Sequence, residues 1–399
     1  MGILSNRAAD AAACFASVQE FFLGERYGAR RGDPDICDFT FGNPHEFPLP
    51  GLVEAIRQRS IPQDKNWFAY KSSEDEPRAF LSERLSAELG LAFEPEDIAM
   101  TAGAFGAIAL AFGLLLDAGD EVVIPLPGWF CYESMLRLAG AVPVEVPLDT
   151  RTFDLDLAAM ESAIGPRTRM VVVNSPHNPT GRIYTRERLL ALSELLERSS
   201  ARFGRRIFLL SDEPYRRIRF DGTPYVSPAS VYPWSLIDYS YGKVLLAPGQ
   251  RLGYLALSPL MPDNDRIVLR DTLFTTQMAL GWTFPNAVMQ YTVPDLEDLS
   301  IDIDALTRRR DLFCEVLGSS GYSLIRPQGT FYLFARAPGG DSHAFFDFLA
   351  QRDVFVMPGS ILKMPQFFRL CLTANDDMVN RSLPAFREAA VRLGGSGRF

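Results

Sequence analysis

The sequence has little of what builds metal sites, disulfide frameworks and membrane spans. Its 399 residues include only three histidines and five cysteines, and the cysteines are scattered without a CxxC pair, at positions 14, 37, 131, 314 and 371. We therefore predict no metal site, no disulfides and a reducing, cytoplasmic location. No apolar run approaches the roughly 20 residues that a membrane span needs. The N-terminus lacks a basic stretch followed by a long apolar one, so we expect neither a signal peptide nor a membrane partner.

Positive charge is also scarce, and lysine is scarcer still. The net charge of -9 argues against nucleic acid as a partner. Only four of the 40 basic residues are lysines, namely Lys65, Lys71, Lys243 and Lys363. A chain that uses arginine for generic positive charge is expected to keep a lysine where a primary amine is needed. An amine can lose its proton and form an imine with an aldehyde, whereas a guanidinium cannot.

Lys243 stands in the stretch around which we read the rest of the chain, YSYGKVLLAPGQRLGY, residues 239–254. Ser240 precedes it by three residues and Arg251 follows it by eight. The glycines of this stretch allow the backbone to approach a ligand closely, and a hydroxyl with a guanidinium can hold a phosphate. The alternative is a surface lysine whose charged head reaches water from a strand end.

The order of elements predicts an α/β protein of about two domains. After a first helix at 7–28, short apolar strands alternate with helices from about residue 97 to residue 257. This alternation is typical of a mostly parallel sheet with helices on both faces. Beyond residue 260 we expect two long helical stretches, at 262–292 and 302–318, followed by a smaller α+β domain.

Several side chains come directly after the predicted strands or in the following loops. Because ligands bind beyond the carboxyl ends of the strands in such sheets, we expect these side chains to meet in one site. They are Trp129, Asn178, Asp212 and Lys243. Gly103, Ala104 and Phe105 open a helix after an earlier strand, and the free backbone N–H groups of such a turn suit a phosphate.

These residue types suit an aldehyde cofactor bound as an imine on Lys243. A carboxylate at Asp212 would keep a ring nitrogen protonated and make the ring an electron sink. Tyr215 and Asn178 can hydrogen-bond a ring oxygen, and Trp129 can stack on the ring. A freed Lys243 amine can then move the α-proton of the substrate. The alternatives are that Asp212 caps a turn and that Trp129 belongs to the core.

Two candidate binding residues lie outside the strand ends. Gly42, in the irregular segment FGNPHEFPLP, can offer bare backbone to a ligand or simply form a turn. Tyr70 belongs to the aromatic and polar loop NWFAYKSSEDE, and such loops often carry binding groups. His177 is interpreted as structural, because the chemistry requires no second base.

Three motifs in this order resemble the class I/II aminotransferases of pyridoxal-phosphate fold type I, the group that includes aspartate aminotransferase. They are SPHNPTG at 175–181, SDEPY at 211–215 and the Ser240–Lys243–Arg251 spacing. RPQGTFYLF and FRLCLTA add the small domain, so the resemblance covers about residues 38–395. It implies an enzyme (EC 2.6.1.-) that moves an amino group between an L-amino acid and a 2-oxo acid. The cofactor would be pyridoxal 5'-phosphate in a Schiff base with Lys243.

The resemblance also implies an architecture and further roles. The large domain, 49–290, would hold a mostly parallel sheet of the seven-stranded type, with a small α+β domain at 291–399 and an N-terminal segment, 1–48, packed on the latter. Arg369 matches the arginine that pairs with the substrate α-carboxylate. Tyr70 matches the tyrosine that reaches the phosphate site of the partner subunit, because the family forms homodimers with sites at the interface.

Some positions depart from the family pattern. Gly242 stands where Ala or Ser is common, and Asp75 stands where a glycine usually follows the tyrosine, so the alignment of Tyr70 is less secure. No second arginine for a side-chain carboxylate is evident at 269–285. Phe274, Trp282 and Phe284 could instead line a pocket for a larger or apolar side chain.

Two other functions compete with transamination. A lyase, cyclase or other biosynthetic enzyme of the same fold, such as a carbon–sulfur β-lyase, would use the same Lys243 and Asp212. A ligand-sensing module descended from such enzymes is disfavoured, because the chain has no basic DNA-binding segment.

Overall fold

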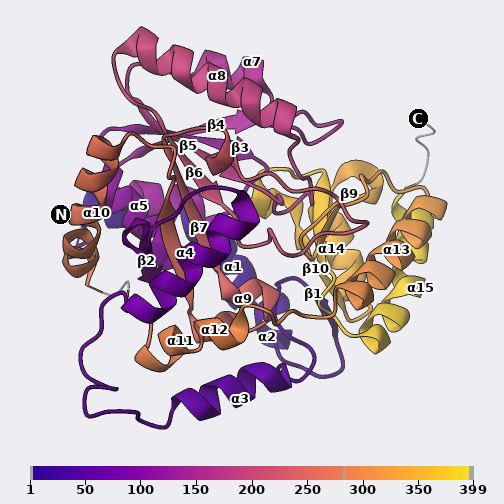
Figure 1. Cartoon of the computed structure of the whole chain (residues 1–399). Coiled ribbons are helices and arrows are strands. Elements are labelled where there is room, and N and C mark those ends of the chain that lie inside the picture. Colours follow the sequence, from indigo (N-terminus) through magenta and orange to yellow (C-terminus); the bar gives the residue numbers. More distant parts are fainter. Residues whose placement is uncertain (1–2, 282–283, 395–399) are drawn as a thin grey trace.

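The computed structural model describes residues 3–281 and 284–394, which form two β-sheets with helices around them (Figure 1). The larger sheet has seven strands in the order β2-β8-β7-β6-β5-β3-β4. Only β8 runs antiparallel to its neighbours. The predicted α/β class with a mostly parallel large sheet is therefore confirmed. The strands are β2 (Ile98–Thr101), β3 (Glu121–Leu126), β4 (Val142–Pro147), β5 (Thr168–Asn174), β6 (Phe208–Asp212), β7 (Ser235–Ser240) and β8 (Gly253–Leu257).

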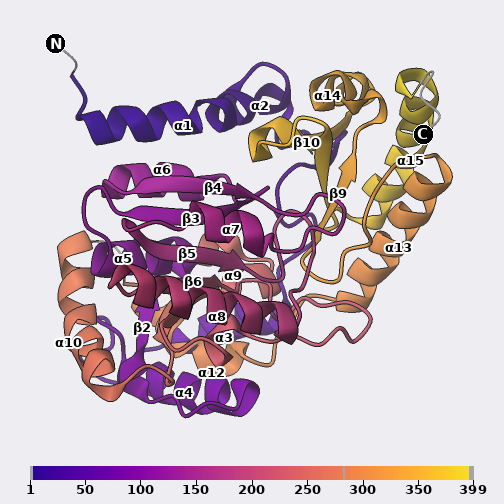
Figure 2. The ribbon, with the colours of Figure 1, turned by 90° about the horizontal axis from the view of Figure 1, so that it is seen from above.

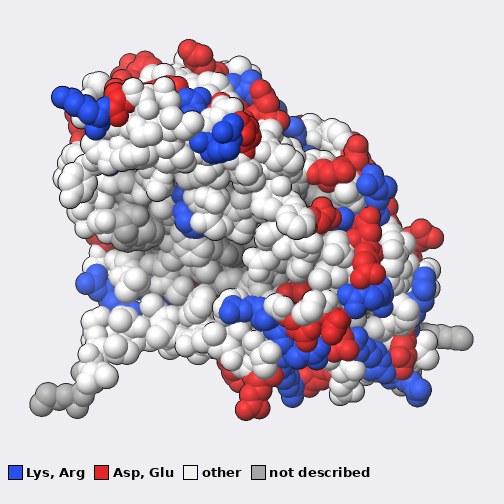
Figure 3. Space-filling view, turned by 90° about the horizontal axis from the view of Figure 1, so that it is seen from below, with Lys and Arg blue, Asp and Glu red and all other residues white. Residues whose placement is uncertain are grey.

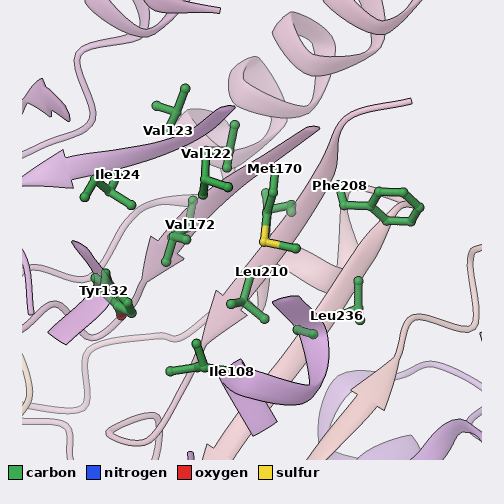
Figure 4. Close-up of a cluster of buried hydrophobic side chains, with 14 of the residues drawn as sticks. Ile108, Val122, Val123, Ile124, Tyr132, Met170, Val172, Phe208, Leu210 and Leu236 are labelled. Carbon is green, nitrogen blue, oxygen red and sulfur yellow. The ribbon is translucent and has the colours of Figure 1, made fainter. Parts of the chain in front are cut away.

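Helices pack on this sheet through a buried apolar core. α7 (Leu157–Ala163) and α8 (Arg186–Phe203) lie together on one face (Figures 1 and 2), and α5 (Gly103–Leu115) contacts β7 and β8. Figure 4 shows side chains of β3, β5, β6 and β7 meeting Ile108 of α5 and Tyr132 of α6 (Cys131–Ala139). Runs of β-branched residues such as Val171–Val173 fill the pleated, two-sided interior of a parallel sheet.

The smaller sheet brings the N-terminal segment to the C-terminal part of the chain. Its order is β1-β10-β11-β9, and β1 pairs in parallel with β10. The strands are β1 (Cys37–Phe39), β9 (Tyr332–Arg336), β10 (Val354–Pro358) and β11 (Phe367–Cys371). The helices of this part are α13 (Ile303–Ser319), α14 (Ser342–Ala350) and α15 (Asp376–Leu393). The predicted boundaries at 48 and 290 stay a prediction.

Two expected helices are interrupted at glycines. The helix expected at 7–28 is divided into α1 (Asn6–Leu23) and α2 (Tyr27–Arg30), because the backbone turns extended at Gly24. The long stretch expected at 262–292 ends as α10 (Asp263–Leu280) at Gly281, whose left-handed φ of 81° suits a helix C-terminus. It resumes as α11 (Ala287–Tyr291) and α12 (Val293–Leu296). The remaining helices are α3 (Pro50–Arg59), α4 (Asp75–Leu89) and α9 (Tyr241–Val244).

No helix within the described ranges is long and apolar enough to cross a membrane.

Candidate active site

A cavity of about 680 Å³ lies where the ends of the large-sheet strands face the smaller sheet. This volume is typical of a site for a small ligand. The following predicted residues line it: Gly42, Ala104, Phe105, Trp129, Asn178, Asp212, Tyr215, Ser240, Lys243, Arg251 and Arg369. Gly103 lies directly behind this wall, against the Arg251 guanidinium. Among the predicted catalytic, cofactor-binding and α-carboxylate-binding residues, only Tyr70 lies elsewhere.

Lys243 is presented by the short helix α9, which begins directly after β7. The Ser240 hydroxyl accepts a hydrogen bond from the Gly242 N–H at 3.3 Å and so caps this helix. A Cβ on Gly242 would lie 3.0 Å from the Pro248 Cα. This close approach favours a glycine where alanine or serine is common in the family. Burial lowers the pKa of Lys243 to about 8, and the positive charges of Arg369 and Arg251 act in the same direction. The amine therefore loses its proton far more easily than an exposed lysine.

Asp212 ends β6 and is buried beneath the cavity. Its Oδ2 accepts hydrogen bonds from the Tyr132 hydroxyl and from the Asn174 Nδ2 at 3.2 Å. Its Oδ1 is buried and accepts no hydrogen bond from the described residues. Burial raises the pKa of Asp212, while its polar neighbours and the charge of Lys243 act in the opposite direction. One oxygen of this carboxylate therefore has no hydrogen-bond donor among the described residues.

A second buried acid stands beside the first. Asp238 of β7 is paired in register with Asp212 of β6, and both side chains are buried. Burial and the nearby charge of Asp212 hold the pKa of Asp238 well above its usual range. Sequence reasoning missed Asp238, Tyr132 and Asn174. The positions of two of them carried a signal, since Asn174 directly precedes the SPHNPTG motif and Tyr132 follows Trp129 by three residues.

Arg369 is a buried cation without an acidic partner among the described residues. It lies within β11, opposite Phe334 of β9. Its guanidinium donates to the Asn178 Oδ1 at 3.2 Å and to the Thr40 carbonyl at 2.8 Å. Its Nε is buried with no hydrogen-bond partner among the described residues, and Arg369 is only 1% exposed. A ligand carboxylate would supply the missing acceptor and charge.

The other end of the cavity suits a phosphate. Gly103 adopts a left-handed φ of 74° and begins α5, so the N–H groups of this helix end are free. The Arg251 Nη2 lies 3.1 Å from where a Cβ of Gly103 would stand. Arg251 donates to the Pro248 carbonyl at 2.7 Å and forms no ion pair within the described ranges. Trp129 meets Phe105 edge to face, with ring centroids 4.6 Å apart.

The described donors fit the cofactor expected from the sequence. The lysine amine would meet an aldehyde, the free Asp212 oxygen would accept from a ring nitrogen, and the α5 end with Arg251 would hold a phosphate. Tyr215 lies beside the lysine, with the Lys243 Nζ 5.9 Å from its ring centroid. His177 is buried and its Nδ1 lies 2.8 Å from the Thr180 hydroxyl, as a structural residue would.

Two of the three aromatic residues expected near the substrate do not line the cavity. The rings of Phe274 and Phe284 are tilted against each other, with centroids 6.2 Å apart, away from the cavity wall. Trp282 lies outside the described residues. Tyr70 is fully exposed in the loop before α4, so its role toward a partner stays a prediction. Asp75 begins α4, where a carboxylate is favourable at a helix N-terminus.

Comparison with known proteins places this site in a family. Residues 34–386 match the family model described as "Aminotransferase class I and II". A probable aspartate/prephenate aminotransferase of Aquifex aeolicus is 30% identical, over 90% of this chain and 92% of the relative. An aspartate aminotransferase of Bacillus subtilis is 28% identical, over 88% and 90%.

Solved structures share the whole fold. An amino transferase from Eubacterium rectale superposes with a TM-score of 0.87 at 31% identity, covering 98% of this chain and 100% of that one. The aspartate aminotransferase of Thermus thermophilus with maleate gives a TM-score of 0.82 at 28% identity, over the same shares.

Proposed function

This chain belongs to the class I and II aminotransferase family and is an aminotransferase, and from this premise we propose that it works with pyridoxal phosphate held covalently on Lys243. The family depends on this cofactor. The reaction moves an amino group between an amino acid and a 2-oxo acid. The observation that carries the proposal is the meeting of a low-pKa lysine, a free carboxylate oxygen of Asp212 and an unpaired Arg369 in one cavity.

When bound, pyridoxal phosphate supplies an aldehyde that links to amines and a ring that takes up an electron pair. Lys243 would hold this aldehyde and, once its amine is free, would take the proton from the substrate α-carbon and carry it for return. Asp212 would keep the ring nitrogen protonated, and Tyr132 with Asn174 holds that carboxylate in place. Tyr215 and Asn178 would hydrogen-bond a ring oxygen, and Trp129 would stack on the ring.

Arg369 is proposed to anchor the substrate α-carboxylate. Its bidentate guanidinium is held by Asn178 and by the Thr40 carbonyl, so it is oriented before substrate arrives. Gly42 lies two residues beyond Thr40 and approaches closely. A Cβ there would stand 2.4 Å from the Phe331 ring and 3.0 Å from the Tyr332 hydroxyl. Its bare backbone therefore lets this segment form the cavity edge beside the carboxylate.

We further propose a homodimer in which Tyr70 serves the phosphate site of the partner subunit. Tyr70 is fully exposed and Phe68 is largely so, which is unusual for aromatic side chains on a monomer. α10 also exposes apolar side chains, including Ile267, Val268, Phe274 and Met278. The proposed large domain, 49–290, would carry the cofactor, and the small domain, 291–399, would carry Arg369.

Borohydride reduction of the protein loaded with pyridoxal phosphate tests the central assignment. Reduction fixes the cofactor to its lysine, and peptide mapping then has only four lysines to distinguish. We expect one label per subunit, on the peptide containing Lys243. A label on Lys65, Lys71 or Lys363, or no label at all, would refute the proposal.

A further inference from the structure

One wall of the active-site cavity is built by the N-terminal helix α1. Phe15, Val18 and Phe22 follow each other at helical spacing, so they share one face, and that face lines the cavity. α1 is held in place on α6, where the Cys14 thiol donates to the Glu133 carboxylate at 3.2 Å. Gln19 is the one polar side chain that α1 adds to the wall.

This apolar wall begins next to the proposed carboxylate anchor. The carbonyl that holds the Arg369 guanidinium belongs to Thr40, and the next residue, Phe41, lines the cavity. Phe41 meets Phe22 edge to face, with ring centroids 5.4 Å apart. A substrate whose α-carboxylate is bound at Arg369 would therefore carry its side chain toward the rings of Phe41 and Phe22.

The cavity has no described cation left over for a second carboxylate. Its basic side chains are Lys243, Arg251 and Arg369, to which we have assigned the cofactor aldehyde, the phosphate and the α-carboxylate. Figure 3 shows a hollow whose surroundings carry few charged side chains, while charge gathers elsewhere on that face. A carboxylate placed against Phe15, Val18 and Phe22 would lose its water without gaining a described cationic partner, which is unfavourable.

We infer that the substrate of this aminotransferase is an amino acid with a large apolar side chain, aromatic or branched, which α1 selects. This inference rests on the proposed function, since it assigns the side-chain pocket of the same site. Phe22 is the specificity residue to examine first, because it joins the wall of α1 to Phe41. Burial of apolar surface on both partners favours such a side chain, whereas a second carboxylate stays uncompensated.

Binding of unreactive carboxylates to the pyridoxal-phosphate-loaded protein tests the pocket without requiring turnover. By calorimetry, we expect 3-phenylpropanoate to bind at least tenfold more tightly than butanedioate. In turnover, phenylalanine or leucine should exceed aspartate in kcat/KM by a similar factor or more. Tighter binding of butanedioate together with preferred turnover of aspartate would overturn the inference, while leaving transamination intact.

A matched pair of variants locates the pocket on the correct face of α1. Phe22→Ala should lower the ratio of kcat/KM for phenylalanine over alanine by about tenfold, the effect of lost apolar contact in a specificity pocket. Phe21→Ala removes the same ring from the neighbouring position, which does not line the cavity, and should leave that ratio within about twofold. Equal ratios in both variants would place the pocket elsewhere. Selective 3-phenylpropanoate binding without transamination would contradict the proposed function and not the pocket.

Discussion

At the scale of single residues, two polar groups of the site are buried without a hydrogen-bond partner within the described chain. The Nε of Arg369 and the Oδ1 of Asp212 are both buried without a hydrogen bond. Leaving such groups unpaired costs roughly 1–3 kcal/mol each, and more when they are charged. The bound cofactor and substrate would supply the partners. The same free energy that these groups cost the empty protein therefore becomes available for binding.

Removing the Arg369 guanidinium should weaken every substrate alike. Arg369→Ala is expected to lower kcat/KM by roughly 10²-fold or more for each amino acid, because a buried, bidentate carboxylate pair contributes a few kcal/mol. Arg369→Lys should recover part of this loss, since lysine keeps the positive charge but cannot form the two parallel hydrogen bonds of a guanidinium. Steady-state kinetics over a panel of amino acids checks this. A changed substrate ranking with a nearly intact rate would show that Arg369 does not anchor the common carboxylate.

The raised pKa of Asp238 predicts that replacing this residue stabilises the fold, and that the stabilisation grows with pH. The folded protein binds this proton more tightly than the unfolded chain, so the stability it brings is present at low pH and lost as pH rises. Asp238→Asn cannot ionise, and should therefore melt at a higher temperature than the parent at pH 8. The expected gain is on the order of 1 kcal/mol, the penalty of one poorly compensated buried group.

Melting curves of the cofactor-free protein at pH 5 and pH 8 measure this gain. The exposed control Asp271→Asn should show no gain that grows with pH. A loss of stability in Asp238→Asn that grows toward pH 8 would reverse the predicted sign.

At the scale of elements, the site depends on where strands end and helices begin. Asp212 ends β6, Lys243 follows the neighbouring strand β7, and the proposed phosphate end is formed by the first turn of α5 at Gly103. Strand ends of this kind are predictable, because apolar runs such as MVVVN and IFLLS are bounded by polar residues. The face of α1 that meets the cavity was not predictable. The spacing of its apolar residues is the same whichever part of the protein α1 packs on. Only the tertiary structure shows that this face lines the cavity.

The same limit explains what else sequence reasoning missed. Asp238 stands inside a strand as a single acid among apolar residues, and only the register with β6 brings it beside Asp212. The interruptions at Gly24 and Gly281 depend on backbone conformations that glycine permits but does not dictate. The motif residues were predicted because their order is specific. The residues that support them were not, because their contacts are distant in sequence.

A methyl group added at Gly103, where the first turn of α5 and Arg251 are proposed to hold the phosphate, should impair cofactor binding. Gly103→Ala introduces a Cβ at a φ of 74° and 3.1 Å from the Arg251 guanidinium. Strain of about 1–2 kcal/mol is expected from the left-handed backbone alone. Gly90→Ala is the matched control, because its φ is 67° and a Cβ there would meet nothing. Both variants should lose similar stability, but only Gly103→Ala should weaken pyridoxal phosphate binding, by tenfold or more in an absorbance titration. Equal affinities of the two variants for pyridoxal phosphate would contradict the proposed phosphate site.

At the scale of the whole molecule, the site joins two bodies of the chain. Lys243 follows the large sheet, whereas Arg369 belongs to the small one. The Lys363 amine, near β10, pairs with Glu133 of α6 and Glu145 of β4 and so ties the two bodies together beside the cavity. A substrate held by Arg369 would span the same boundary, and its binding could draw the two bodies together and exclude water.

The proposed homodimer can be tested by mixing two inactive or impaired forms. Light scattering should give a mass near twice the 44.5 kDa of the chain. Tyr70→Phe should weaken cofactor binding about tenfold, the loss of a hydrogen bond to a charged group. Mixed with Lys243→Ala, it should form hybrids in which one site has an intact Lys243 and an intact Tyr70 from the partner, restoring affinity there. Failure of hybrids to recover would mean that Tyr70 acts within its own subunit or not at all.

The two half-reactions test the account most directly. Purified protein loaded with pyridoxal phosphate is mixed with phenylalanine in the absence of any acceptor. We predict that the cofactor absorption converts once to the amine form, with one 2-oxo acid released per subunit and no ammonia. Addition of a 2-oxo acid should restore the original spectrum, and Lys243→Ala should fail in both steps. Continuous release of ammonia without an acceptor, as a lyase would give, or full turnover by Lys243→Ala, would contradict it.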